Sequence, residues 1–223
     1  MPQTLPAVPD PDARQMPTWW RWLACALTAI APSVVALEFS DIAREGELRF
    51  LATHPEPGGY RYESRVRILA ESFTTGIVEL STCHLQLDPI RKIVIAFNPK
   101  RLQDLSITSA SGIGGLAVKD HHVEMTEVSR GASICIELRS KALDRISQNT
   151  FRLQAGPLMR RYLDGYLPMQ ASLTFEWPEQ LATLEQTHPR PQPGVVFNAG
   201  SDRATLDMIF AGRLLANIDL RLR

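Results

Sequence analysis

Nine consecutive residues in the C-terminal third of the chain alternate strictly between apolar and polar side chains. The segment runs from Met169 to Trp177, and its apolar members are Met169, Ala171, Leu173, Phe175 and Trp177. Successive side chains of a β-strand point to opposite faces, so this period of two predicts a strand with one face against a core. A chain built around such a strand needs further strands to complete a sheet.

Shorter runs of the same kind, separated by turn residues, occur throughout residues 37–223. Arg61–Ile68 alternates, with Tyr62, Ser64, Val66 and Ile68 on one face, and Ile93–Phe97 is apolar throughout. Leu206–Phe210 and Leu214–Leu222 follow, and Gly212 between them is predicted to be a bulge or a tight turn. Short strands at such intervals are typical of sandwiches and barrels. The sequence therefore predicts a mostly β fold, an antiparallel β-sandwich of about seven to ten strands.

Glycine-containing segments mark the turns that we expect between these strands. Gly112–Gly115 and Ser129–Gly131 are both predicted to be turns. Lys119–His121 is predicted to be the turn of a hairpin whose arms are Leu116–Val118 and Val123–Val128.

One segment favours a helix over a strand. Gly156-Pro157 is a suitable helix start, an apolar stripe at helical spacing follows, and Gly165 stands where a C-terminal cap would fall. The stripe predicts one short α-helix near 157–164; it consists of Leu158, Met159, Tyr162 and Leu163. Glu179–Gln186 is a candidate for a second short helix, and the prolines at alternate positions of 188–193 favour an extended connector.

The N-terminal segment has the pattern of a secretory signal. Trp22–Ala36 is apolar, Arg21 precedes it, Pro32 breaks it, and small residues end it. We expect residues 1–36 to be a signal peptide, with translation starting at Met1 or at Met16, and residues 37–223 to form a single β-sandwich domain. A spanning helix needs about 20 apolar residues, so we expect no stable membrane span after cleavage; an uncleaved anchor is the alternative.

The expected location and the net charge limit which partners the mature protein can have. A periplasmic or secreted location is oxidising, and cleavage removes Cys25, so the two remaining cysteines, Cys83 and Cys135, are expected to form a disulfide. If Cys83 points inward, His84 points outward. The chain carries 24 basic and 24 acidic residues, a net charge of zero, which disfavours nucleic-acid binding.

A metal site is one alternative for the function. His121, His122 and Met125 lie close together in sequence, and imidazole with thioether suits copper. Adjacent strand residues point to opposite faces, so both imidazoles reach one ion only if the turn redirects one of them.

Catalytic patterns are weak. Gly112–Ala117 fits the dinucleotide fingerprint formally, but no helix is predicted after it, so we interpret it as a turn and expect no cofactor. A hydrolase with dispersed carboxylates is the second alternative, with Asp164 between Tyr162 and Tyr166 as its best candidate. Arg160-Arg161 is a candidate partner-contact patch.

These patterns together favour an exported, non-enzymatic binding or accessory protein. Its compact β scaffold offers loops for contact, and we expect its partner to be a protein of the cell envelope. A copper-type metal handler and a secreted hydrolase remain the two alternatives.

Overall fold

The computed structural model describes residues 42–44, 47–163 and 165–223. The chain divides into two units, residues 1–34 and 35–223, and every described residue belongs to the second unit. The predicted signal peptide, with Met16, Arg21 and Cys25, therefore lies outside the described residues. No helix in the described part of the chain is long and apolar enough to cross a membrane.

The described residues form fifteen strands and one helix, more strands than the sequence predicted, because several short edge strands carry too few residues to show a pattern. In chain order the elements are β1 (Leu48–Phe50), β2 (Arg61–Arg67), α1 (Ser72–Thr75), β3 (Ile77–Leu87), β4 (Lys92–Ala96), β5 (Leu102–Lys119), β6 (His122–Lys141), β7 (Leu143–Arg145), β8 (Thr150–Leu158), β9 (Arg160–Tyr162), β10 (Gly165–Leu167), β11 (Met169–Glu176), β12 (Ala182–His188), β13 (Val195–Ala199), β14 (Arg203–Gly212) and β15 (Leu214–Leu222).

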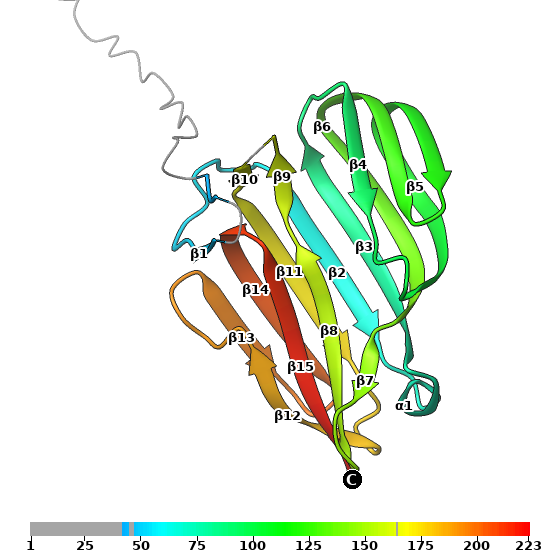
Figure 1. Ribbon diagram of the computed structural model, residues 1–223. Helices are drawn as coiled ribbons and strands as arrows, with labels where there is room; N and C mark the ends of the chain where they lie inside the picture. The colour runs from blue at the N-terminus through cyan, green and yellow to red at the C-terminus, as the bar shows by residue number, and fades with distance from the viewer. Residues whose placement is uncertain (1–41, 45–46, 164) are drawn as a thin grey trace, which may run out of the picture. The chain divides into compact units, whose positions relative to one another are not determined.

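The strands form two main sheets and a small ribbon (Figure 1). The larger sheet has the order β1-β14-β11-β2-β3-β6-β4, with β13 also paired to β14 and β5 also paired to β6. The smaller sheet has the order β12-β15-β8-β7, and β9 pairs with β10. Neighbours are antiparallel except β2 and β11, which run parallel over Arg61–Arg67. The predicted antiparallel arrangement therefore holds for every described strand pair except this one, which alternation could not reveal because it does not identify a strand's neighbour.

One hydrophobic core joins the inner faces of the two main sheets. Leu173 and Phe210 of the larger sheet lie in the same buried cluster as Phe151 and Ile218 of the smaller one. The predicted strand at Met169–Trp177 is confirmed as β11, whose apolar side chains are all buried. A mostly β, sandwich-like arrangement follows from these contacts.

The predicted helix near 157–164 is wrong. Leu158 continues β8 and pairs with Leu214, while Gly156 has a φ of 109°, which no helix accepts. The apolar stripe is not buried either, since Leu163 is 77% exposed. The candidate second helix over Glu179–Gln186 is also wrong, because β12 occupies most of that range. The single helix is instead α1, which ends at Gly76 in a left-handed conformation.

The predicted hairpin at Lys119–His121 is confirmed, because β5 and β6 pair up to Lys119 and His122. The predicted turns at Gly112–Gly115 and Ser129–Gly131 are wrong, since both segments lie inside these two long strands. They mark an irregularity in the pairing instead. From Ser111 to Ile113, β5 advances by two residues while its partner β6 changes by five. The predicted break at Gly212 is confirmed, since β14 ends there and β15 begins two residues later.

The β5–β6 hairpin is bent back at this irregularity. Phe97 N donates to His121 O at 2.8 Å, and Lys141 N donates to Arg101 O at 2.8 Å. Residues 97–101 span at most about 14 Å, so the two ends of β6 lie close together. A straight strand of that length would extend about 60 Å. Figure 1 shows the bent hairpin beside β4.

Candidate binding surface

The outer edge of β5 is the longest strand edge in the described structure. β5 has 18 residues and pairs only with β6 among the described strands. β4, which also pairs with β6 at this end of the sheet, has only five residues. From residue 105 to residue 118 the sequence is LSITSASGIGGLAV, without a charge or a proline. Edge strands are normally protected by such residues, because their free N–H and C=O groups recruit other strands.

The two halves of β5 turn their apolar side chains to the same face of the sheet. Leu105 and Ile107 lie opposite the buried Leu138 and Ile136 of β6, and directly paired residues share a face. In the other half, Leu116 and Val118 lie opposite the buried Met125 and Val123. All four therefore face inward, although Leu116 and Val118 remain 40% and 48% exposed. These four residues are called the β5 apolar row below.

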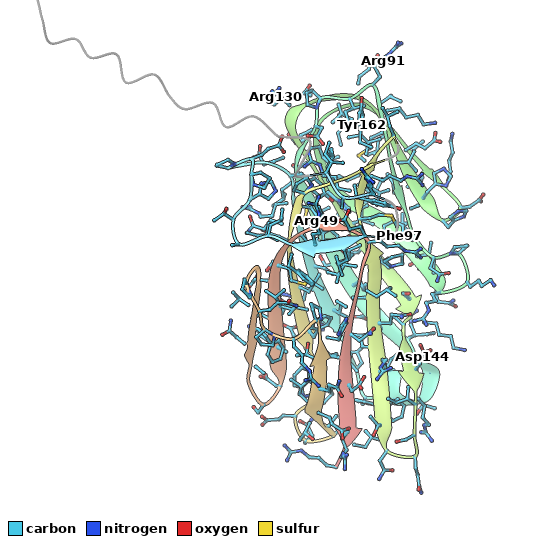
Figure 2. All side chains as sticks on the ribbon, turned by 60° about the vertical axis from the view of Figure 1, so that its left-hand side comes forward. Arg49, Arg91, Phe97, Arg130, Asp144 and Tyr162 are labelled. Atoms are coloured by element: carbon cyan, nitrogen blue, oxygen red, sulfur yellow. A yellow bond between two sulfur atoms is a disulfide. The ribbon has the colours of Figure 1, made fainter. Side chains whose placement is uncertain are left out.

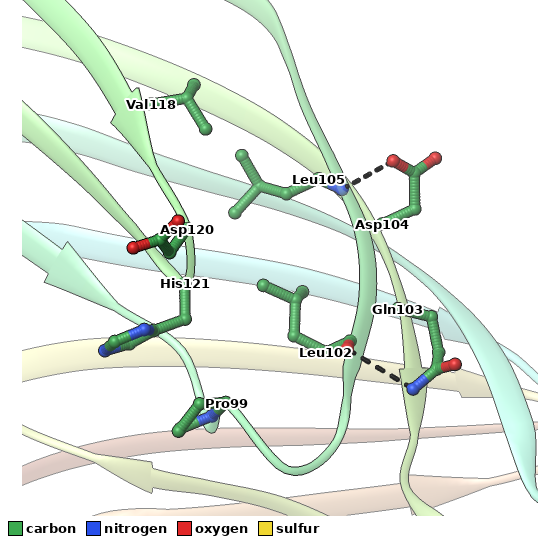
Figure 3. A pocket seen from close by; sticks show the side chains of 8 residues that line it. All are labelled: Pro99, Leu102, Gln103, Asp104, Leu105, Val118, Asp120 and His121. Carbon is green, nitrogen blue, oxygen red and sulfur yellow. Dashed lines mark hydrogen bonds between the residues drawn. The ribbon is translucent and has the colours of Figure 1, made fainter.

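An open hollow lies where the two ends of β5 approach each other. Its volume is about 410 Å³. In Figure 3, Leu102 and Leu105 point toward Val118 and His121, whereas Asp104 and Gln103 point away on the other side of the strand. The hollow is lined by Pro99, Leu102, Gln103, Asp104, Leu105, Val118, Asp120 and His121.

Charged groups flank the edge on its outer face. Lys119 at the end of β5 forms an ion pair with Glu124, and Lys92 of β4 donates to the same carboxylate at 3.0 Å. Hydrogen bonds from Lys119 and Lys92 lower the pKa of Glu124 to about 2. Asp104, near the start of β5, accepts a hydrogen bond from the backbone N–H of Leu105 at 2.9 Å.

The structure does not bring the three predicted metal ligands together. The rings of His121 and His122 lie 5.4 Å apart, and His122 Nε2 is 3.5 Å from Glu124 Oε1. Met125 is fully buried in the core, on the face of β6 opposite His122 and Glu124. No group of three or more His, Cys, Asp or Glu residues suited to a metal is found in the described part of the chain.

The predicted disulfide is present between β3 and β6. Cys83 lies directly opposite Cys135, with 4.1 Å between their Cα atoms. Both side chains are on the partly exposed outer face, and the flanking Thr82, His84 and Ile136 are buried. His84 thus points inward and Cys83 outward. The two residues lie on opposite faces as predicted, but the condition that Cys83 points inward is not met.

His84 and Tyr60 form a buried polar pair. Tyr60 Oη lies 2.7 Å from His84 Nδ1, and His84 Nε2 has no hydrogen-bond partner among the described atoms. Burial lowers the pKa of His84 to about 4 and raises that of Tyr60. At neutral pH the imidazole is therefore uncharged.

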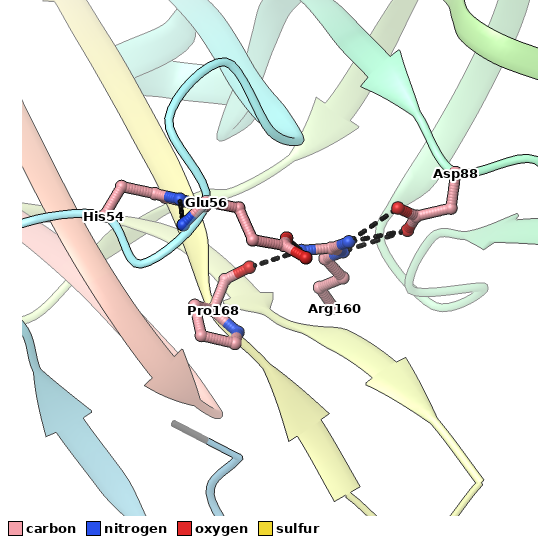
Figure 4. A network of polar contacts seen from close by, with 5 residues as sticks. All are labelled: His54, Glu56, Asp88, Arg160 and Pro168. Carbon is pink, nitrogen blue, oxygen red and sulfur yellow. Dashed lines mark hydrogen bonds and ion pairs between the residues drawn. The ribbon is translucent and has the colours of Figure 1, made fainter. Parts of the chain in front are cut away.

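The Arg160 side chain is engaged in contacts within the protein and is not available to contact a partner. Its side chain is 9% exposed and makes a bidentate contact with Asp88, with one N–O distance of 2.7 Å (Figure 4). It also donates to Pro168 O at 2.8 Å and pairs with Glu56 at 3.4 Å. These partners take up the donors of the guanidinium, so the candidate patch at Arg160-Arg161 is reduced to the exposed Arg161.

Only two of the three residues of the predicted hydrolase site, Tyr162 and Tyr166, lie within the described residues. Asp164 lies outside the described residues. Tyr162, labelled in Figure 2, is 51% exposed, whereas Tyr166 is buried. The two tyrosines therefore do not present their rings to solvent together. The dinucleotide-like Gly112–Ala117 lies within β5 and precedes a hairpin turn, so no helix N-terminus follows it.

Comparison with known proteins leaves the family open. No family model matches the chain, and no curated protein matches it. A solved M1 zinc metallopeptidase from Deinococcus radiodurans is 11% identical with a TM-score of 0.38, over 76% of this chain and 44% of that one. Aminopeptidase A from Legionella pneumophila is 8% identical with a TM-score of 0.34, over 80% and 23%. The chain spans less than half the length of these proteins, and likenesses at this level do not bear on its activity.

The β5 edge was not among the candidate sites predicted from the sequence. Interpreting Gly112–Gly115 as a turn divided one strand into two short pieces. The available signal was the uncharged run of residues 105–118, bounded by Asp104 and Lys119.

Proposed function

We propose that this protein is an exported, non-enzymatic binding protein that recruits an extended polypeptide by strand addition at β5. The observation that carries the proposal is the free edge of β5, 18 residues long and uncharged from residue 105 to residue 118. In strand addition the backbone hydrogen bonds supply affinity, and alternate side chains supply specificity. The β5 apolar row and the adjacent hollow offer contacts for those side chains.

Two observations support export to the periplasm or the medium. Trp22–Ala36 has the composition of a signal-peptide core. The Cys83–Cys135 disulfide suits an oxidising compartment. On this proposal the partner belongs to the cell envelope, and N-terminal sequencing of the exported protein should begin at Leu37; another first residue would contradict the proposed cleavage.

Site-specific photo-crosslinking in the exporting cell tests the binding edge. A photo-reactive amino acid replaces Ser106 or Ala117, which both lie on β5, or Arg65 as a control. Arg65 is exposed on β2, whose two edges are already paired with β3 and β11. We expect covalent adducts with a polypeptide from both β5 positions and none from position 65. The absence of adducts at β5, or equal adducts at position 65, would overturn the proposal.

A further inference from the structure

β5 is complementary to a reversed copy of itself. Its two charged residues, Asp104 and Lys119, have opposite signs and stand at opposite ends of the uncharged run. If two β5 strands pair antiparallel with their centre between Ser111 and Gly112, Asp104 of each copy lies opposite Lys119 of the other. Directly opposite charges of unlike sign stabilise an antiparallel pair.

The same register matches the apolar side chains. It places Leu105 opposite Val118 of the second copy and Ile107 opposite Leu116. All four residues of the β5 apolar row face inward, so each pair meets on one face of the extended sheet. Asp104 and Lys119 both face outward with Ser106 and Ala117. At each end of the interface, four consecutive positions, 104–107 and 116–119, pair regularly with β6 and are free of bulges.

The bend of the hairpin is compatible with this pairing. A two-fold axis perpendicular to the sheet, through the middle of a bent strand, generates a second strand that runs in the opposite direction. This second strand bends toward the same face of the sheet as the first. Such an axis therefore requires the bend to lie at the centre of the register. The irregularity between Ser111 and Ile113, where Gly112 has a φ of 71°, lies at that centre.

From these three matches we infer that the strand recruited by β5 is β5 of a second copy, so that the protein is a two-fold dimer with a continuous sheet. This inference rests on the proposed function, since it names the occupant of the same edge. Charge, side-chain face and curvature each fit that register. A foreign segment would need only an extended backbone and has no such constraint, so it is the alternative that the experiments separate.

Cysteine pairing tests the register directly. Two variants of the full chain, Ser106→Cys and Ala117→Cys, are purified with Cys25→Ser in both, mixed, and oxidised. The register places positions 106 and 117 of different copies opposite each other, within reach of a disulfide. We expect a covalent dimer from the mixture and little from either variant alone. Equal cross-linking in all three samples, or none in the mixture, would overturn the inference.

Charge reversal tests the end pairs by sedimentation of the purified protein. Lys119→Glu and Asp104→Lys each place like charges opposite each other twice per dimer, and we expect the dimer dissociation constant to rise about 10-fold or more. The double variant should restore the dimer. Lys92→Glu is the matched control, because it also places an acid beside Glu124 but lies on β4. It should leave the dimer unchanged.

The outcomes separate this inference from the proposed function. A wild-type protein that remains monomeric at high concentration, yet gives photo-adducts with a foreign polypeptide at positions 106 and 117, overturns the dimer and supports a foreign partner at the same edge. A monomer without adducts overturns both proposals. Loss of the dimer in Lys92→Glu to the same extent as in Lys119→Glu would show that the charge pairs lie elsewhere and would overturn the register.

Discussion

At the scale of single residues, His84 is a titratable group buried in the core. Its imidazole is buried, its Nδ1 is bound to Tyr60 Oη, and its Nε2 has no partner among the described atoms. A buried imidazole without a carboxylate beside it is held neutral, because the charged form loses its hydration. Stability of the fold should therefore depend on the protonation of this one side chain.

His84 should make the protein less stable in mild acid. Its pKa is about 4 in the fold and about 6.5 in an unfolded chain, so only the unfolded state takes up the proton between those values. The contribution is fully present above pH 6.5, falls as the pH drops from 6.5 toward 4, and amounts to about 3 kcal/mol. Urea unfolding at pH 7.5 and 4.5 should show this loss, and His84→Gln should reduce it.

His188→Gln is the control for this experiment, because His188 is exposed on β12. This variant should follow the wild-type pH profile. If His84→Gln loses as much stability between pH 7.5 and 4.5 as the wild type does, the buried imidazole is not the source of the pH dependence.

At the scale of elements, the disulfide joins two neighbouring strands that are remote in sequence. Cys83 and Cys135 are separated by 52 positions, and cross-linking a loop of this length stabilises a fold by about 4 kcal/mol in the chain-entropy model. We expect Cys83→Ser/Cys135→Ser to lower the free energy of unfolding by about that amount, measured in urea. Reduced wild-type protein should match the double variant; a loss below about 1 kcal/mol would contradict the entropic account.

Strands with one dry face were predictable from sequence, and their neighbours were not. β11 and β2 follow from alternation that any sheet would impose. The helix near 157–164 was wrong because four apolar residues at helical spacing are too few to outweigh the pairing of β8 with β15. Sequence alone could not say whether Cys83 or His84 points inward, because alternation fixes which residues share a face, but not which face is buried.

The binding edge was unpredictable for a related reason. A bulge and a turn have the same glycine-rich composition, so Gly112–Gly115 could not be assigned without knowing that β6 continues opposite it. The disulfide was predictable because only two cysteines remain after residue 36. The expected copper-type ligands remain a prediction that elemental analysis of purified protein would test.

At the scale of the whole molecule, Arg160 ties together segments that are distant in sequence. It joins β9 to Glu56 in the β1–β2 connection, to Asp88 after β3, and to the carbonyl of Pro168. Arg160 is 9% exposed, whereas Asp88 and Glu56 are 35% and 31% exposed, so removal of the guanidinium leaves partly hydrated carboxylates and costs about 2 kcal/mol. Arg160→Met should therefore lower the free energy of unfolding by about that amount in urea, whereas the exposed neighbour Arg161→Met should cost less than about 1 kcal/mol. Equal effects would contradict this role.

The parallel pairing of β2 with β11 has a consequence for the order of events during synthesis. Arg61 pairs with Gln170, more than 100 positions later, so the interior of the larger sheet cannot close until β11 has been synthesised. Contacts between such distant segments form slowly. A nascent chain therefore passes through a stage in which β2 is complete but its neighbour has yet to be made. During that interval a holdase chaperone would protect the unpaired edge of β2 from pairing with other strands.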